Sequence, residues 1–306
     1  MTRKTLPIAL LALAVLCGCG GAAETGTETG TETGAAPSPS AAAAKDKKHQ
    51  LEAAKADCMK QKGFKYVAWV KPEQPQSDED RRRDAGDYQA MRKYREKYGF
   101  EVFAEFIYPK ELNAPAAQRE SPNQDPNMKL QEALSEAQLG AYHKAKDACM
   151  VTAGKQVLGV TLKSNLDYYN QIALTRKRAT ATTLDSDPKL VELAGAMATC
   201  LKGKGYAVTD TTPTAMAKRG RDAFLKEQDK LGREQDDTVP DVAPPAKKGD
   251  NQPIHMPSLT AEQARPYLAK EIKAALDDLE CGKDFYPVFT PRKSAIDAQV
   301  RAQFAY

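Results

Sequence analysis

The side chains that could do chemistry in this sequence are few. The three histidines, His49, His143 and His255, lie far apart, and no His-Glu-x-x-His motif occurs. No Gly-x-Ser-x-Gly nucleophile elbow is present either. Ser186-Asp187-Pro188-Lys189 has the Ser-x-x-Lys form, but the Lys-Thr-Gly motif that such serine enzymes also need does not follow it. A helix start is the better interpretation, and we predict no catalytic residue, no metal site and no cofactor.

The six cysteines carry more information than the other reactive side chains. Cys17 and Cys19 lie close to the N-terminus, and Cys58, Cys149, Cys200 and Cys281 are spread over the rest of the chain. None of these last four belongs to a Cys-x-x-Cys pair. In an oxidising compartment they would form disulfides, for which three pairings exist.

The N-terminus indicates the compartment. Arg3 and Lys4 precede an apolar run over residues 6–16, which is typical of an export signal. The run is too short to span a bilayer, which needs about 20 residues in a helix. It ends in Leu16-Cys17-Gly18-Cys19, which resembles the bacterial lipobox. This resemblance implies cleavage of residues 1–18, acylation of the Cys19 sulfur (the palmitate type of anchor) and stable attachment to a membrane; an unmodified export signal is the alternative.

Residues 19–48 are expected to form a disordered tether between the anchor and the folded part. They contain a repeated Glu-Thr-Gly-Thr pattern, a Pro-Ser-Pro-Ser segment and four successive alanines. No large apolar residue occurs between residues 20 and 48, so burial cannot offset the loss of chain entropy on folding. A glycosylated stalk is the alternative interpretation.

The rest of the chain contains three blocks that each occur twice, in the same order. The paired blocks cover residues 58–64 and 200–206, 90–99 and 223–232, and 134–142 and 259–267. The first pair reads Cys-Met-Lys-Gln-Lys-Gly-Phe and Cys-Leu-Lys-Gly-Lys-Gly-Tyr. We therefore predict an internal duplication, with repeat 1 over 49–154, a helical connector over 155–186 and repeat 2 over 187–306.

The blocks have the character of helices. Leu190, Leu193 and Met197 follow three- and four-residue steps, and Asp187 is placed to cap their helix. Ser-x-x-Gln at 135–138 and Thr-x-x-Gln at 260–263 are capping boxes. Short strands are expected at 66–70 and 207–209, and 101–108 is expected to be a strand or a packed extended segment. The predicted fold class is mainly α with a few short strands, in two tandem homologous repeats that are each closed by a disulfide.

The duplication also favours one disulfide pairing. Each repeat holds two cysteines at equivalent places, and a single ancestral unit had to close its own bridge. We therefore predict Cys58–Cys149 and Cys200–Cys281. Free thiols in the core are the alternative.

Two kinds of surface are candidates for binding. Phe64, Tyr66 and Trp69 form an aromatic group that repeat 2 lacks, so they are a candidate binding surface, with core packing as the alternative. The basic runs 81–83 and 176–178 would contact anionic headgroups or wall polymers, unless they are simply solvated faces. Loss of Arg3 and Lys4 would lower the net charge of +4 to about +2, which gives no argument for nucleic acid.

With its lipobox, its tether and its two Cys-x-x-x-x-Gly-aromatic helices, the chain resembles uncharacterised envelope lipoproteins of high-GC Gram-positive bacteria. The resemblance implies a lipid-anchored protein on the extracytoplasmic face of the cell membrane, and it carries over no activity. We expect a non-enzymatic binding or interaction module whose partner is an envelope protein or an anionic wall polymer. The alternative is a hydrolase of wall or extracellular substrates that uses carboxylates.

Overall fold

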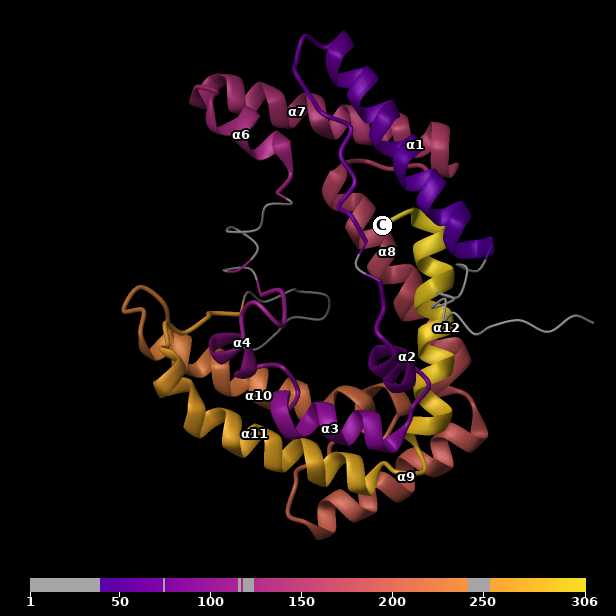
Figure 1. Cartoon of the computed structure of the whole chain (residues 1–306), viewed down its shortest axis with the longest axis vertical. Coiled ribbons are helices and arrows are strands. Elements are labelled where there is room, and N and C mark those ends of the chain that lie inside the picture. The colour runs from indigo at the N-terminus through magenta and orange to yellow at the C-terminus, as the bar shows by residue number, and fades with distance from the viewer. Residues whose placement is uncertain (1–38, 74, 115–116, 118–123, 242–253) are drawn as a thin grey trace, which may run out of the picture. The chain divides into compact units, whose positions relative to one another are not determined.

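The computed structural model describes residues 39–306, except 74, 115–116, 118–123 and 242–253 (Figure 1). The expected signal segment 1–18, Cys19 and residues 19–38 of the expected tether lie outside the described residues. Pro37–Tyr306 group into one compact unit, so the two expected repeats do not form separate compact units.

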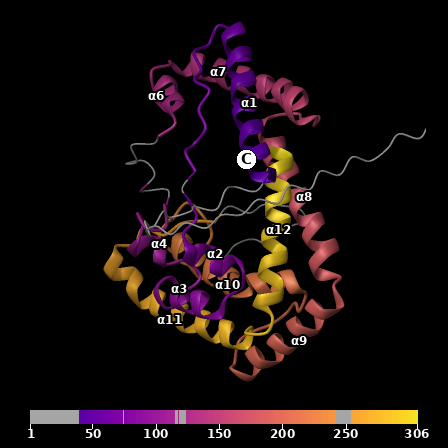
Figure 2. The same cartoon turned by 45° about the vertical axis from the view of Figure 1, so that its right-hand side comes forward.

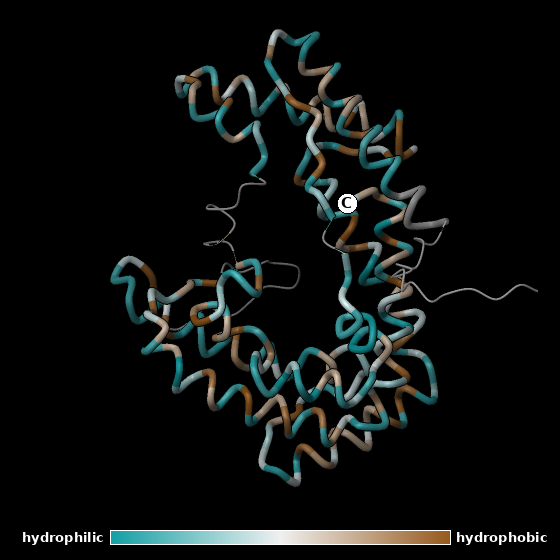
Figure 3. Tube along the Cα trace, in the orientation of Figure 1, coloured by the Kyte–Doolittle hydropathy of each residue, from teal (hydrophilic) through white to brown (hydrophobic). Residues whose placement is uncertain are grey.

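Helices make up most of the described structure. In chain order they are α1 (Pro39–Gln61), α2 (Asp78–Asp84), α3 (Tyr88–Tyr98), α4 (Ala104–Ile107), α6 (Pro126–Glu132), α7 (Glu136–Ala153), the π-helical turn η1 (Gly154–Leu158), α8 (Asn165–Thr180), the π-helical turn η2 (Ala181–Asp185), α9 (Pro188–Gly203), α10 (Pro213–Glu234), α11 (Ala261–Cys281) and α12 (Tyr286–Phe304). Apolar and polar residues are interleaved along them (Figure 3). Among the described residues, no helix combines the length and the apolar character that crossing a membrane requires.

The first helix corrects the expected boundary of the tether. Helix α1 begins at Pro39, so residues 39–48 of the expected tether 19–48 are helical. Proline suits the first helical position, because its missing N–H would have no partner there. Alanine, which follows at 41–44, has the highest intrinsic helix propensity.

Both predicted disulfides are confirmed. Cys58 in α1 is bonded to Cys149 in α7, and Cys200 in α9 is bonded to Cys281 in α11. The Cα–Cα distance is 5.5 Å in each bridge, which is usual for a disulfide. Helix α1 packs along α7 and α9 along α11, and α1 and α7 lie side by side in both views (Figures 1 and 2).

The helix caps predicted from the sequence are also confirmed. The Asp187 carboxylate accepts the Leu190 N–H at 2.9 Å at the start of α9. The capping boxes that begin at Ser135 and Thr260 are complete in α7 and α11. The predicted connector contains α8, with the π-helical turns η1 and η2 on either side.

The predicted strands are wrong: none of the described residues is in a strand. Within 66–70, the backbone of Val67 pairs with a side chain instead of another strand. Its N–H donates to Asn127 Oδ1 at 2.8 Å, and its carbonyl accepts from Asn127 Nδ2 at 2.9 Å. Residues 207–209 are likewise outside any strand or helix. The aromatic segment 101–108 instead contains the short helix α4.

Helix packing crosses between the two expected repeats. Helix α3, from repeat 1, packs against α11 of repeat 2, whereas α10 packs against both α9 and α11. One apolar cluster joins Val102, Phe103 and Ala104 to Leu268 in α11, with Phe224 of α10 packed against it. The largest cluster combines residues of α1, α7, α8, α9 and α12. The segment that follows α3 is therefore held by the second half of the chain, and this contact shapes the candidate site.

Candidate functional site

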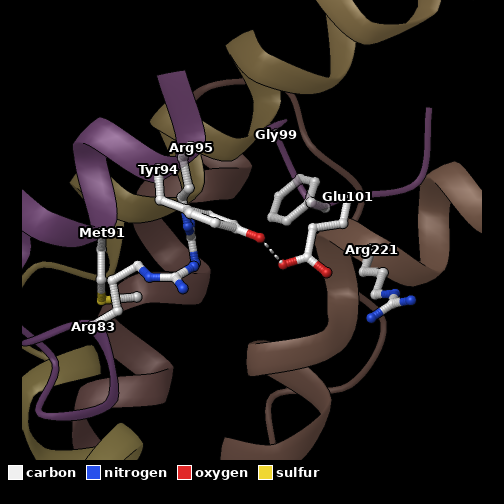
Figure 4. A pocket seen from close by; sticks show the side chains of 8 residues that line it. Arg83, Met91, Tyr94, Arg95, Gly99, Glu101 and Arg221 are labelled. Atoms are coloured by element: carbon white, nitrogen blue, oxygen red, sulfur yellow. Dashed lines mark hydrogen bonds between the residues drawn. The ribbon is translucent and has the colours of Figure 1, made fainter. Parts of the chain in front are cut away.

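A small hollow lies where α2, the end of α3 and α10 meet (Figure 4). Its volume is about 210 Å³, and it is lined by Arg83, Met91, Tyr94, Arg95, Gly99, Phe100, Glu101 and Arg221. Three guanidinium groups thus surround one carboxylate and an apolar wall. A few polar groups beside apolar and aromatic walls are typical of small-molecule sites.

Behind the hollow, Arg95 is fixed by a buried charge cluster. Its Nη1 donates to Asp278 Oδ1 at 2.8 Å and to the Ala275 carbonyl at 2.9 Å. Asp278, which is 1% exposed, also accepts from Arg219 and from the Tyr286 hydroxyl. Burial lowers the pKa of Arg95, but Tyr286 and Asp278 raise it more, so the net pKa lies above its ordinary value. Arg95 is therefore a charged structural member of the wall.

Glu101 enters the hollow because a second buried carboxylate holds the backbone around it. Glu271 in α11 is fully buried. It accepts the backbone N–H groups of Phe100, Val102 and Phe103 at 2.7, 2.9 and 2.8 Å. Burial raises the pKa of Glu271, and these three donors act in the opposite direction. Glu101 lies between these hydrogen-bonded N–H groups. It has a φ of 74°, a left-handed conformation that residues other than glycine seldom adopt.

Tyr94 connects the two sides of the hollow. Its hydroxyl donates to Glu101 Oε1 at 2.6 Å, as the dashed line in Figure 4 marks. The Arg83 guanidinium lies 3.6 Å from the centre of the Tyr94 ring and also pairs with Asp80. Burial and the hydrogen bond to Glu101 raise the pKa of Tyr94, so its hydroxyl stays protonated and keeps donating.

A second hollow of about 420 Å³ continues along α3 and shares Arg83 and Tyr94 with the first. We call the two together the α3 groove. The second hollow has a tyrosine wall: the ring centres of Tyr94 and Tyr98 are 4.7 Å apart. Its other lining residues are Glu79, Asp80, Ala90, Lys93, Lys97, Glu111 and Leu112.

The carboxylates of this second hollow are all paired with cations. Glu79 pairs with Lys93 at 2.8 Å, Glu111 with Lys97 at 2.6 Å, and Asp80 with Arg83. Hydrogen bonds from Lys93 and Lys97 lower the pKa of Glu79 and Glu111. These three acids are therefore ionised at neutral pH.

The structure places the predicted aromatic residues mostly in packed positions. Phe64 packs edge-on against Tyr142, with ring centres 5.6 Å apart. The Tyr66 hydroxyl donates to Glu52 at 2.7 Å, and burial raises the pKa of Tyr66. Both rings pack against the cluster that contains the first disulfide, whereas Trp69 is half-buried and belongs to none of the described apolar clusters.

The two basic runs are also largely engaged. In α2, Arg81 pairs with Asp78, Arg82 with Asp87 and Arg83 with Asp80. In α8, Arg176 lies 2.9 Å from Asp297, whereas Lys177 and Arg178 are exposed. Of the two runs, only the first contributes a side chain to the α3 groove.

Sequence reasoning missed the α3 groove. The repeated block at 90–99 was expected to be helical, but nothing in the sequence placed that helix beside α10. Arg221 gave no signal, because its neighbours in the chain form no recognisable motif.

Other candidate sites are weaker. Two further hollows, one beside Cys58 and one along α10, have no aromatic lining residue. Within the described ranges, no group of histidine, cysteine, aspartate and glutamate side chains is arranged to hold a metal ion.

Comparisons of the chain with protein-family models, with curated proteins and with solved structures found no match. The α3 groove therefore has to be interpreted from its own geometry.

Proposed function

We propose that the protein is a lipid-anchored, non-enzymatic binding module on the extracytoplasmic face of the cell membrane, and that the α3 groove contacts its partner. The anchor rests on the lipobox at residues 16–19. The groove supports the binding role because it combines an aromatic wall with five cations against four carboxylates over two adjoining hollows. An anionic polymer of the cell wall suits this surface better than an apolar protein segment does.

The observation that carries the non-enzymatic part of the proposal is the state of the groove's carboxylates. A glycosidase-like hydrolase needs one carboxylic acid with a raised pKa beside a second, ionised carboxylate. Glu79, Asp80 and Glu111 have lowered pKa values. The described carboxylates with a raised pKa, Glu105 and Glu271, line neither hollow. Glu105 and Glu271 therefore supply no proton donor to this groove, and its three acids that are paired with cations are ionised.

We also propose that repeats 1 and 2 arose by duplication. The three paired sequence blocks support it, and so does the equivalent position of each disulfide, which joins the helix carrying the first block to the helix that begins within the third. Under this proposal, α3 and α10 descend from one helix and now lie on the same partner, α11.

The test uses the full chain expressed in a bacterium that processes lipoproteins. Mass spectrometry should find a mature N-terminus at Cys19 that carries acyl chains, and Cys19→Ser should release the protein from membranes. The purified mature chain should then retain isolated wall polymer without shortening it. An unmodified N-terminus would refute the anchor, and shortened polymer would refute the non-enzymatic role.

A further inference from the structure

We propose that the first hollow of the α3 groove binds an acidic sugar unit: its carboxylate pairs with Arg221, and a neighbouring hydroxyl donates to Glu101. This inference rests on the proposed binding function and names the ligand class for it. It depends on three observations: the conformation of Glu101, the Arg221 guanidinium without a hydrogen-bonded partner, and the apolar side chains of Phe100 and Met91 in the same lining.

The first observation is that a carboxylate is displayed at an unfavourable backbone position. A φ of 74° suits glycine, because a side chain there crowds the neighbouring carbonyl. Strained residues of this kind persist where the surroundings enforce them, and they gather at functional sites. Here the buried Glu271 enforces the strain through three backbone N–H groups. The result is a Glu101 side chain that points into the hollow (Figure 4).

The second observation is that one of the three guanidinium groups is uncommitted. Arg83 has Asp80 as its partner, and Arg95 has Asp278. Arg221 is exposed, and within the described ranges it forms no hydrogen bond or ion pair, although its charge favours the ionised forms of Glu105 and Glu271. Figure 4 shows it across Glu101 from Tyr94. Its planar fork of donors suits a carboxylate, which can accept two parallel hydrogen bonds from it.

Together these groups restrict the ligand. A simple anion would meet Arg221 but would be repelled by the Glu101 carboxylate, one oxygen of which already accepts from Tyr94. A neutral sugar would leave the Arg221 charge unused. A sugar acid provides both an anion for Arg221 and hydroxyl donors for Glu101, while its C–H surface covers Phe100 and Met91.

The shape of the groove extends the inference from one unit to a chain. The first hollow, of about 210 Å³, opens beside the second, of about 420 Å³, where Arg83 and Tyr94 belong to both. In the second hollow the charges are paired and the wall is tyrosine, so the next unit of the chain need not be acidic.

The experiment is a calorimetric titration of the full mature chain with a trimer of glucuronic acid. Maltotriose, which has no acid, and inorganic phosphate, which has no carbon-bound hydroxyl, serve as comparison probes. We expect the acidic trimer to bind at least about tenfold more tightly than either of them, the effect of one charge-assisted contact. Equal affinity for maltotriose or for phosphate would overturn the assignment.

Two variants locate the contact. Arg221→Ala should weaken binding of the acidic trimer about tenfold, whereas Lys230→Ala, a matched control at an exposed position of the same helix, should leave it unchanged. Glu101→Gln keeps an acceptor for Tyr94 but removes the charge, so it should weaken the acidic trimer and strengthen inorganic phosphate. If neither variant changes binding while the parent chain still retains isolated wall polymer, the acidic-sugar site is refuted and the binding function stands. A parent chain that binds neither the trimer nor wall polymer refutes both.

Discussion

Replacing Glu271 tests how α11 shapes the candidate site. The carboxylate is fully buried and accepts three backbone N–H groups at 2.7–2.9 Å. Glu271→Ala leaves these donors without a partner, and the amides of Val102 and Phe103 lie in buried positions. A buried donor without a partner costs about 1–3 kcal/mol, so we expect a loss of about 4 kcal/mol in the free energy of unfolding.

Glu271→Gln keeps the volume of the side chain and one acceptor oxygen. It replaces the second oxygen by an NH₂ group, which faces N–H donors, so we expect a smaller loss of about 2 kcal/mol. Urea unfolding followed by circular dichroism at neutral pH measures both values. Glu262→Gln, at an exposed position of the same helix, is the control and should change stability by about 0.5 kcal/mol or less.

The result that would refute this reasoning is a Glu271→Ala loss below about 1 kcal/mol, because that is the least that even one buried donor without a partner should cost. A second consequence can be checked on the same samples. Without Glu271, the three backbone N–H groups around Glu101 lose their shared acceptor. Glu271→Ala should therefore lose more binding of the acidic trimer than its unfolded fraction alone explains. Unchanged binding by the folded variant would show that Glu271 does not position Glu101.

Three further predictions concern the helices around the groove. Serine at both Cys200 and Cys281 should lower the free energy of unfolding by about 4–5 kcal/mol, because this bridge closes a loop with a sequence separation of 81; urea unfolding measures the loss. Asp277→Asn should flatten the fall of Tm below pH 4. A hydrogen bond from Lys204 lowers the pKa of Asp277. The contribution of Asp277 to stability is therefore present above the unfolded pKa of about 3.9, and it is lost as the pH falls through the folded pKa. Gly220→Ala should cost about 1–3 kcal/mol and weaken the acidic trimer, because the added Cβ would lie 2.1 Å from Phe100 Cζ; urea unfolding and calorimetry measure the two effects.

Each of these predictions has a clear contrary result. If the serine double variant is as stable as the parent, the Cys200–Cys281 bridge does not stabilise the protein by restricting the unfolded chain. Parallel Tm curves for Asp277→Asn and the parent would contradict the lowered pKa. A Gly220→Ala variant of unchanged stability would mean that the Phe100 ring moves aside freely.

Local patterns made much of the fold predictable. The disulfides followed from two equivalent cysteine pairs, and the caps at Ser135, Asp187 and Thr260 each depend on residues within four positions of one another. The predicted strand at 66–70 failed for a longer-range reason, since Asn127 supplies the partners that an adjacent strand would have given to Val67.

The candidate site was beyond sequence reasoning because its parts meet only through tertiary packing. In the sequence, Arg83 belongs to a basic run for which a solvated face was one interpretation. Arg221 lies more than a hundred residues further along the chain. They come together because α3 packs on α11 and α10 covers the segment after it. The three aromatic residues at 64–69 stood out in the sequence, yet two of them, Phe64 and Tyr66, pack beside the first disulfide.

The central claim is that the α3 groove, and not the aromatic segment over 64–69, contacts the ligand. Hydrogen–deuterium exchange of the full mature chain, with and without the wall polymer it retains, tests this directly. We expect slower exchange in peptides that cover α3, the turn at 99–103 and the middle of α10, with no change at 64–69. Slower exchange confined to 64–69 would contradict it.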